Sequence, residues 1–346
     1  MNIRPMLADD GTLRDLQDPN AAAELKLDGT RAWLIKKDEE KGIFGRPREG
    51  ISTDYTDRLK EVREAIEGIP AGSFIMDVEI AYFDPKTGRS IFEGSQRRCS
   101  TQDKAKQREY EKTWPIQAMA FDLIQLDGKM LHNYAWETRK QILQDLLKES
   151  LQKGIAFLPH TIDKKQELYS KVTARGEEGV MVKRLGSRYE EGRRSRSWLK
   201  VKHWNTERCL VVGYTAGRGN RLGYFRSLIL AQPGPDGRLR HVGTVGSGFD
   251  KDEIRKIYRM LTAAEVDDPR VDARTSTGKR VEHTPVYIDL EIEVRFQEIS
   301  KRGVFRMPTV LKDEYGHNLI HYDSRRITAK PRPTNLKDML KELGEK

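Results

Sequence analysis

Apolar residues recur at helical spacing in two stretches of residues 1–203. One stripe begins at Leu59, and the other runs through residues 137–152, where the apolar positions fall on one side of a helix. We therefore predict a helix over each stretch. Both stripes are expected in the core, and they consist of Leu59, Val62, Ala65 and Ile66 in the first helix and of Ile142, Leu143, Leu146, Leu147 and Leu151 in the second.

Short apolar runs elsewhere in the chain favour strands. The segments that separate these runs change in character from residue 204 onward. Up to that point, the runs at 32–35, 74–81, 116–123 and 179–182 alternate with helical patterns. After it, glycine-rich turns separate the runs at 210–214, 227–231, 241–245 and 290–297, a pattern that favours a small β-barrel. We therefore predict an α+β domain over residues 1–203 and a β-barrel domain over residues 204–346, with the boundary near His203.

Two further helices are expected in the second domain. One covers residues 250–262. The other covers residues 335–343, where Asn335 follows Pro333 and is suited to be the N-cap. Its apolar edge consists of Leu336, Met339, Leu340 and Leu343.

The composition adds an expectation about partners. The chain has 346 residues and a formal net charge of +10, because 63 Lys and Arg side chains outnumber 53 Asp and Glu side chains. Such an excess favours an anionic partner, of which nucleic acid is the commonest, although a solvated, charge-rich surface would give the same composition. A hydrophobic fraction of 37% is sufficient for packed cores.

The cysteines and the apolar runs bear on the compartment. Cys99 and Cys209 are too few and too far apart for a disulfide framework or a four-cysteine zinc site. The first ten residues contain no apolar segment typical of a signal peptide, and no run approaches the roughly 20 apolar residues that span a bilayer. We expect a monomer without membrane contact, cytoplasmic and nucleoid-associated, or nuclear in a eukaryote.

The segment that bears most directly on chemistry is ELKLDGTR at residues 24–31, in which a lysine precedes an Asp-Gly turn. Alone, it is more typical of a surface hairpin. Four later segments change that interpretation, because each joins a strand-like apolar run to charged or aromatic residues: DVE at 77–79, FDL at 121–123, EEGVMVK at 177–183 and WLKVK at 198–202. In the last, Lys200 and Lys202 project from the same face of a strand and require an anion or solvent.

In order and spacing, these five segments resemble the nucleotidyltransferase motifs shared by ATP-dependent DNA ligases, RNA ligases and mRNA capping enzymes. The resemblance covers nearly the whole chain. It implies a nucleotidyltransferase (adenylation) domain of antiparallel sheets with helices, followed by an OB-fold β-barrel domain. For the DNA ligases it further implies ATP as substrate, Mg²⁺ or Mn²⁺ as the metal, and nicked double-stranded DNA as the partner.

The resemblance also implies roles for individual residues of the first motif and its neighbour. Lys26 would be the nucleophile that carries AMP. Glu24 would lie by the adenine, and Arg31 near the ribose or the phosphates. Arg46, in GRPR at 45–48, resembles the arginine that follows the nucleophile motif, although two extra residues precede Gly50 in this chain.

Later motifs would complete the nucleotide site. Phe121 resembles the aromatic residue that stacks on adenine, Lys183 belongs to the nucleotide-binding set, and Lys200 and Lys202 match the pair that holds the α-phosphate. The chemistry accounts for these residue types, because a lysine attacks phosphorus only when neutral and its ordinary pKa is about 10.4. Neighbouring cations lower that pKa and neutralise the charge that builds on the α-phosphate.

Two carboxylates are the expected metal ligands. Glu79 resembles the residue that contacts the ribose or a metal, and Glu178 resembles the second carboxylate of the metal site. Carboxylate oxygens suit Mg²⁺, which keeps several of its waters in protein sites and would orient the departing pyrophosphate.

The second half of the chain extends the resemblance to DNA ligases. Residues 212–215, 228–230 and 242–249 resemble the start of their OB-fold domain. The loop GRGNRLG at 217–223 lacks the ending of a phosphate-binding loop, so we interpret it as a β-turn and keep open a contact from Arg218 or Arg221 to DNA phosphates. The last motif departs from the family pattern, since only Lys312 and Asp313 approximate its basic-x-Asp-Lys element. The residue that contacts the leaving pyrophosphate therefore stays open.

Other enzymes share the nucleophile motif. NAD-dependent ligases carry a zinc-binding cysteine cluster, which two cysteines cannot supply; capping enzymes use GTP; and RNA ligases usually lack the WLKVK form and this type of OB domain. A catalytically dead nucleic-acid-binding module stays an alternative, although such a descendant would be expected to have lost Lys26 first. We therefore expect a DNA ligase that forms lysyl-AMP, passes AMP to the 5′-phosphate of a nick and seals the nick, with a hinge near His203.

Overall fold

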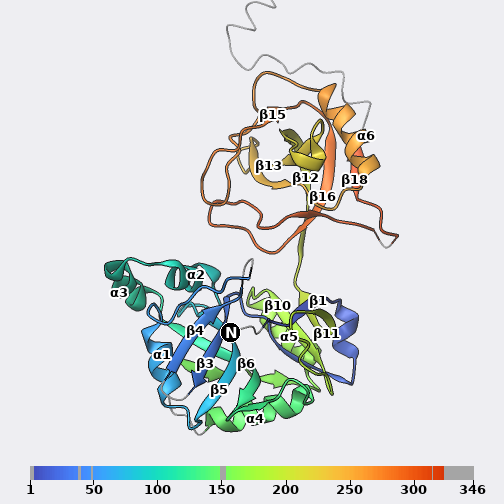
Figure 1. Cartoon of the computed structure of the whole chain (residues 1–346). Coiled ribbons are helices and arrows are strands. Elements are labelled where there is room, and N and C mark those ends of the chain that lie inside the picture. The colour runs from blue at the N-terminus through green and yellow to red at the C-terminus, as the bar shows by residue number, and fades with distance from the viewer. Residues whose placement is uncertain (1–3, 38–39, 48–49, 149–152, 314, 323–346) are drawn as a thin grey trace, which may run out of the picture. The chain divides into compact units, whose positions relative to one another are not determined.

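The computed structural model describes residues 4–37, 40–47, 50–148, 153–313 and 315–322, and the chain divides into two compact units, residues 1–203 and 204–346 (Figure 1). The helix expected over residues 335–343 lies outside the described residues. None of the described helices is both long enough and apolar enough to cross a membrane.

The first unit contains two β-sheets whose strands are mostly antiparallel. The six-stranded sheet has the order β4 (Glu40–Gly45), β3 (Thr30–Lys37), β5 (Ser73–Tyr82), β6 (Ile116–Leu126) and β7 (Lys129–Met130), with β8 (Ile155–Phe157) parallel to β6. The five-stranded sheet has the order β1 (Leu7–Asp10), β11 (Arg194–Lys202), β10 (Gly179–Arg184), β2 (Ala21–Leu25) and β9 (His160–Thr161).

The helices of this unit pack on the outer faces of the two sheets. On the six-stranded sheet lie α1 (Lys60–Glu67), α2 (Phe92–Ser100) and α4 (Trp136–Lys148), and α3 (Lys104–Thr113) follows α2. On the five-stranded sheet lie α5 (Lys165–Ala174) and the 3-10 turn η1 (Leu13–Gln17). The two predicted helices are confirmed as α1 and α4, except that residues 149–152 lie outside the described part.

Alternation along the strands leaves one face of each sheet turned toward the other. In β3, Ala32 and Leu34 join the core beneath α1 and α4, whereas Trp33 and Ile35 belong to a second cluster that contains Phe121. In β10, Val180 and Val182 pack in a third cluster with Val172 of α5. The side chains between these apolar positions therefore lie between the two sheets, where a site can form.

The second unit is built on a seven-stranded sheet. Its strands are β12 (Asn205–Ala216), β13 (Phe225–Pro233), β14 (Leu239–Val245), β15 (Thr284–Pro285), β16 (Leu290–Phe296), β17 (Thr309–Val310) and β18 (Ile320–Tyr322). The 3-10 turn η2 (Gly219–Arg221) and the helix α6 (Lys251–Thr262) complete it. Asp250 caps α6 and forms a capping box with Glu253, which accounts for the start of the predicted helix.

The structure differs from the predicted β-barrel in one respect: among the described residues, the sheet of the second unit is open. Its order runs from β14 through β13, β12 and β16 to β17, and no pairing between described strands joins the two ends. Residues 299–305 instead fold back on themselves, as the bridge between Ile299 and Phe305 shows. Among the described residues, the backbone of residues 299–310 makes two hydrogen bonds to β14 and the residues after it, from Phe305 N to Val242 O at 2.6 Å and from Val310 N to Ser247 O at 3.3 Å.

Candidate nucleotidyltransferase site

One face of the five-stranded sheet carries most of the predicted site. In β11, Leu199 and Val201 point into the cluster with α5, so Lys200 and Lys202 project from the opposite face, as the sequence predicted. The antiparallel register places Met181 of β10 between Glu24 and Lys200. Charged side chains of three neighbouring strands therefore meet on one surface.

The facing sheet supplies the other wall, and a pocket of about 230 Å³ lies between them. Arg31 of β3 and Glu79 of β5 are register partners, and Phe121 of β6 lies on the same side of the sheet. Eight predicted residues line this pocket: Glu24, Lys26, Arg31, Arg46, Glu79, Phe121, Lys183 and Lys200. The structure thus brings together residues of all five motifs.

The remaining two predicted residues, Glu178 and Lys202, meet Lys26 at the Glu178 carboxylate. Its Nζ donates to Oε2 of Glu178 at 2.5 Å, and Nζ of Lys202 lies 3.1 Å from Oε1 of the same carboxylate. Burial alone would raise the pKa of Glu178, but the two ammonium groups outweigh it and hold this pKa below its ordinary value. The backbone N–H of Lys26 also donates to the carbonyl of Gly179 at 3.0 Å, which fixes the nucleophile motif to β10.

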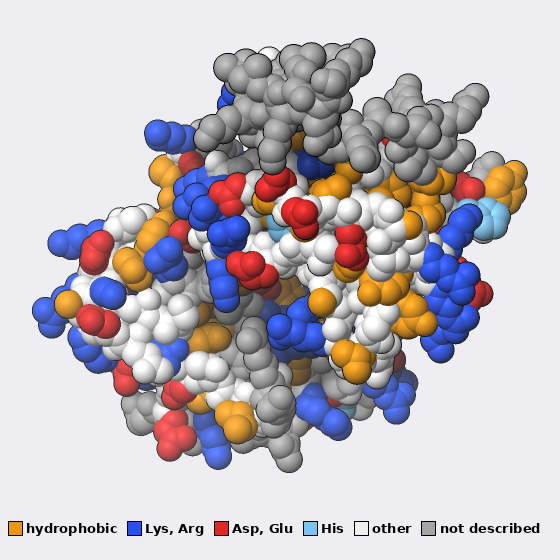
Figure 2. Space-filling view, turned by 90° about the horizontal axis from the view of Figure 1, so that it is seen from above, with side chains coloured by type: hydrophobic (Ala, Val, Ile, Leu, Met, Phe, Trp, Pro, Cys, Tyr) orange, Lys and Arg blue, Asp and Glu red, His pale blue; other side chains and the backbone are white. Residues whose placement is uncertain are grey.

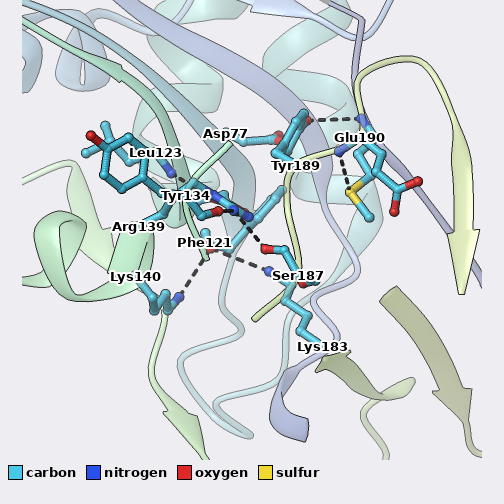
Figure 3. Close-up of polar contacts among 12 residues, drawn as sticks. Asp77, Phe121, Leu123, Tyr134, Arg139, Lys140, Lys183, Ser187, Tyr189 and Glu190 are labelled. Carbon is cyan, nitrogen blue, oxygen red and sulfur yellow. Dashed lines mark hydrogen bonds and ion pairs between the residues drawn. The ribbon is translucent and has the colours of Figure 1, made fainter. Parts of the chain in front are cut away.

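Glu24 lies deeper, in a buried ionic cluster with two lysines. Its carboxylate oxygens lie 2.6 Å from Nζ of Lys140 and 2.6 Å from Nζ of Lys183, and all three side chains are at most 2% exposed. Both ammonium groups also point at the carbonyl oxygen of Phe121, at 3.4 Å (Figure 3). Burial lowers the pKa of Lys140 to about 8, although Glu24 opposes the shift.

Lys140 was missed by the sequence reasoning, although a signal existed. It lies three and seven positions before Leu143 and Leu147, on the apolar stripe of α4, where a charged residue needs a buried partner.

Arg31 is fixed by two residues to which the sequence reasoning gave no role. Its Nε and Nη2 donate to both carboxylate oxygens of Asp77, at 2.8 and 2.6 Å. The Tyr189 hydroxyl donates to Asp77 at 2.7 Å (Figure 3). The same hydroxyl accepts from Arg31 at 3.1 Å. Although burial would lower it, the pKa of Arg31 is raised by Asp77, so its charge is permanent. The guanidinium carbon lies 5.4 Å from the centre of the Phe121 ring.

Glu79 has a different electrostatic setting from Glu178. Burial raises its pKa to about 8, and the charges of Lys26 and Arg31 oppose the shift without reversing it. Gly29 allows this close packing, because a Cβ at that position would lie 2.5 Å from the Ile80 carbonyl oxygen and 2.8 Å from Cγ of Glu79. A side chain at position 29 would therefore displace the carboxylate.

Lys200 and Arg46 lie on the outer side of the pocket. Nζ of Lys200 pairs with Oδ1 of Asp10 at 3.1 Å, and this hydrogen bond lowers the pKa of Asp10. Arg46 borders a second, larger cavity as well, which it shares with Arg31 and Glu79. Arg46 thus lies where the pocket meets a wider polar groove.

Comparisons with known proteins identify the family. A family model described as the ATP dependent DNA ligase domain matches residues 5–202, and one described as the ATP dependent DNA ligase C terminal region matches residues 221–313. The chain belongs to the ATP-dependent DNA ligase family. A solved structure of a mycobacterial DNA ligase D complexed with ATP and MES is 26% identical to it, with a TM-score of 0.52, over 93% of this chain and 96% of that one.

Curated relatives in this family are longer proteins. The multifunctional non-homologous end joining DNA repair protein LigD of Mycobacterium tuberculosis is 30% identical over 305 residues, which are 88% of this chain and 37% of that protein. A DNA ligase of Sulfurisphaera tokodaii is 31% identical over 308 residues, which are 83% of this chain and 49% of that protein. The chain therefore spans half or less of the length of these two relatives.

The side chains of this site supply only part of the ligands that a metal ion needs. Among the described residues, no group of three or more His, Cys, Asp or Glu side chains is arranged to hold a metal ion. Glu79 and Glu178 are the two carboxylates beside Lys26, and Mg²⁺ commonly takes one or two carboxylates together with substrate phosphates. A hard cation at this position thus depends on phosphate oxygens for the rest of its coordination.

In the second unit of this ligase-family chain, two residues whose roles the sequence left open make local hydrogen bonds. Arg221 donates to the carbonyl oxygens of Arg226 at 3.0 Å and Gly246 at 2.7 Å, so its guanidinium holds the loop in place. Asp313 accepts from the backbone N–H groups of Tyr315 and His317, which occupies Oδ1 in a tight turn. These contacts give both residues a structural role.

Proposed function

We propose that this protein is an ATP-dependent DNA ligase that seals 5′-phosphate/3′-hydroxyl nicks through an AMP adduct on Lys26. The observation that carries the proposal is the contact between Lys26 and Glu178 at the pocket that eight predicted site residues line. The contact joins the first and fourth motifs, which lie 152 positions apart in the sequence. Family membership and the likeness to a ligase complexed with ATP support it.

The adenine end of ATP is expected at the Phe121 ring. That ring is 8% exposed and lies beside Lys183 and Glu24, so it offers an apolar face next to a polar cluster. Arg31, which Asp77 holds rigidly, presents its charge toward the ribose and phosphates. The nucleotide would then lie between the two sheets with its α-phosphate near Lys26.

The first chemical step joins Nζ of Lys26 to the α-phosphorus and breaks the bond from that phosphorus to the leaving pyrophosphate. Because the pKa of Glu178 is low, this carboxylate orients the lysine and does not remove its proton. The proton passes to water, which reaches Lys26 because 18% of its side chain is exposed. Lys200 and Lys202 neutralise the charge that builds on the α-phosphate in the transition state.

Mg²⁺ would be held by Glu79 and Glu178 together with phosphate oxygens, and it would supply charge neutralisation at the leaving pyrophosphate. In the second step the 5′-phosphate of the nick attacks the phosphorus of the adduct and Lys26 is released. In the third step the 3′-hydroxyl attacks the activated 5′-phosphate and AMP departs. Each step makes one bond to phosphorus and breaks another.

DNA binding is attributed to basic side chains of both units. The net charge of +10 favours a polyanion, and Figure 2 shows Lys and Arg side chains spread over the face it presents, with acidic side chains among them. Phosphate contacts of this kind position a duplex without reading its sequence. We therefore expect the protein to act on nicks in any sequence.

The test is a pulse and chase. Purified protein freed of bound AMP is incubated with labelled ATP or GTP and Mg²⁺, and half of each sample is chased with a nicked DNA duplex or with nicked RNA. Label from ATP that leaves the protein as the DNA nick closes is the expected result. Label from GTP would instead indicate a capping-type enzyme, chase onto RNA alone an RNA ligase, and no label a binding module.

A further inference from the structure

Ser90 and Glu177 lie outside the family motifs' catalytic residues, yet they join the two segments that carry Lys26 and Glu178. Both side chains are buried, at 3% exposure each. Ser90 N donates to Oε1 of Glu177 at 3.1 Å, and the Ser90 hydroxyl donates to Oε2 at 2.8 Å. The same hydroxyl oxygen accepts a hydrogen bond from the backbone N–H of Asp28 at 3.0 Å.

Each partner of Ser90 stands next to a site residue. Asp28 lies two positions after Lys26, in the link from β2 of one sheet to β3 of the other. Glu177 directly precedes Glu178 and the start of β10. Ser90 itself is attached to the six-stranded sheet, through its bridge to Phe83 and the neighbouring hydrogen bond from Ile91 N to the Tyr82 carbonyl.

The Ser90 hydroxyl acts as a donor toward one segment and as an acceptor toward the other. Its single proton is donated to Glu177, which leaves a lone pair to receive the N–H of Asp28. Because Ser90 engages both carboxylate oxygens, Glu177 has one defined orientation. Hydrogen bonds to a buried carboxylate are among the stronger ones, so the three segments are fixed relative to one another.

We propose that Ser90 and Glu177 are a pair of positioning residues that set the placement of Lys26 against Glu178 for AMP transfer. The inference rests on the proposed function, because it takes Lys26 as the nucleophile. Neither residue touches the nucleotide in this account; each acts through the backbone of its neighbours. Loss of the pair should slow the chemical step while ATP still binds between the sheets.

The variants are Ser90→Ala, Glu177→Gln and the double variant, with Ser90→Thr as the version that keeps the hydroxyl. Ser95→Ala is the matched control, since Ser95 is also a fully buried serine in the next segment and donates to the Phe92 carbonyl at 3.0 Å. For each protein the single-turnover rate of adduct formation is measured against ATP concentration. The thermal midpoint of unfolding is measured in parallel.

We expect Ser90→Ala and Glu177→Gln to lower the rate at saturating ATP by on the order of 10- to 100-fold, with the half-saturating ATP concentration changed by less than about threefold. The double variant should be no slower than the slower single variant, because the two residues act as one unit. Ser90→Thr should stay within about threefold of the wild type. Ser95→Ala should lower the thermal midpoint and leave the rate unchanged.

The inference would be overturned if the folded Ser90→Ala and Glu177→Gln variants formed the adduct at the wild-type rate. It would also be overturned if their rates of adduct formation fell no further than that of Ser95→Ala. If Ser90→Ala does not fold, Glu177→Gln, which keeps the shape of the side chain, decides alone by the same rate criterion. A wild type that forms no adduct on Lys26 would instead overturn the proposed function. The two failures are therefore distinguishable in one experiment.

Discussion

Lys26 and Glu178 are 152 positions apart in the sequence, and the ammonium of the first donates to the carboxylate of the second at 2.5 Å. The contact follows from the antiparallel pairing of β2 with β10, which continues in the hydrogen bond from Lys26 N to the Gly179 carbonyl. Lys202 shares the same carboxylate from the strand on the other side of β10. Three neighbouring strands therefore determine where the amine of Lys26 lies.

Replacement of Glu178 by glutamine should slow adduct formation by on the order of 100-fold, because an uncharged amide cannot hold both Lys26 and Lys202 in position. The rate is measured by quench-flow with labelled ATP. Glu64→Gln, at an exposed carboxylate of α1, is the control and should retain the wild-type rate. An equal rate for Glu178→Gln would refute the orienting role.

The Lys140→Met variant should lower the free energy of unfolding by about 3 kcal/mol, because it removes one partner from a buried carboxylate. It should also weaken ATP binding, since Glu24 lines the pocket beside Phe121. Urea unfolding and ATP titration measure the two effects. Lys148→Met, at an exposed position of the same helix, should change the free energy of unfolding by less than about 0.5 kcal/mol. A variant at Lys140 as stable as the wild type would contradict the buried cluster.

The two cysteines should be unreactive toward thiol reagents at pH 8 in the folded protein and should both react after unfolding. Burial raises the pKa of Cys99 and of Cys209 to about 12, above the ordinary value of 9.0. Because the unfolded chain loses these protons first, the contribution of both thiols to stability is present below pH 9.0 and declines as the pH rises above it. Thiol titration and urea midpoints between pH 8 and pH 10 measure this. Rapid reaction of either thiol in the native state would contradict the burial.

DNA affinity should fall steeply with salt, whereas adduct formation at saturating ATP should change little. Each phosphate contact releases bound counterions, so the affinity for a nicked duplex should drop at least about tenfold between about 50 and about 200 mM salt. Fluorescence anisotropy with a nicked duplex measures the first quantity, and labelled ATP the second. An affinity independent of salt would argue against binding through the basic side chains.

Local patterns in the sequence were sufficient to predict which face of each strand and helix is buried and which carries the site residues. Alternation in β11 separates Leu199 and Val201 from Lys200 and Lys202, and it holds in the structure because β11 lies in the sheet interior between β1 and β10. The apolar stripes of α1 and α4 likewise identified their buried sides. The order of the motifs then indicated which residues meet at the pocket.

Contacts between distant segments were beyond the sequence reasoning. Tyr189 reaches Asp77 across 112 positions, and Ser90 reaches Glu177 across 87, and no local period marks either partner. The open sheet of the second unit was not predicted either, and there residues 299–305 pair with one another through the bridge from Ile299 to Phe305. Such features depend on tertiary packing, which hydrophobic periodicity does not encode.

Lys26 is proposed to carry AMP between ATP and DNA, and peptide mass spectrometry after incubation with ATP and Mg²⁺ locates the adduct. We expect one AMP on the peptide that contains Lys26, no adduct in Lys26→Ala, and a normal adduct in Lys37→Ala, a control at the exposed end of β3. Addition of nicked DNA should remove the adduct as the nick closes. An adduct on another residue, or one that persists in Lys26→Ala, would contradict the account.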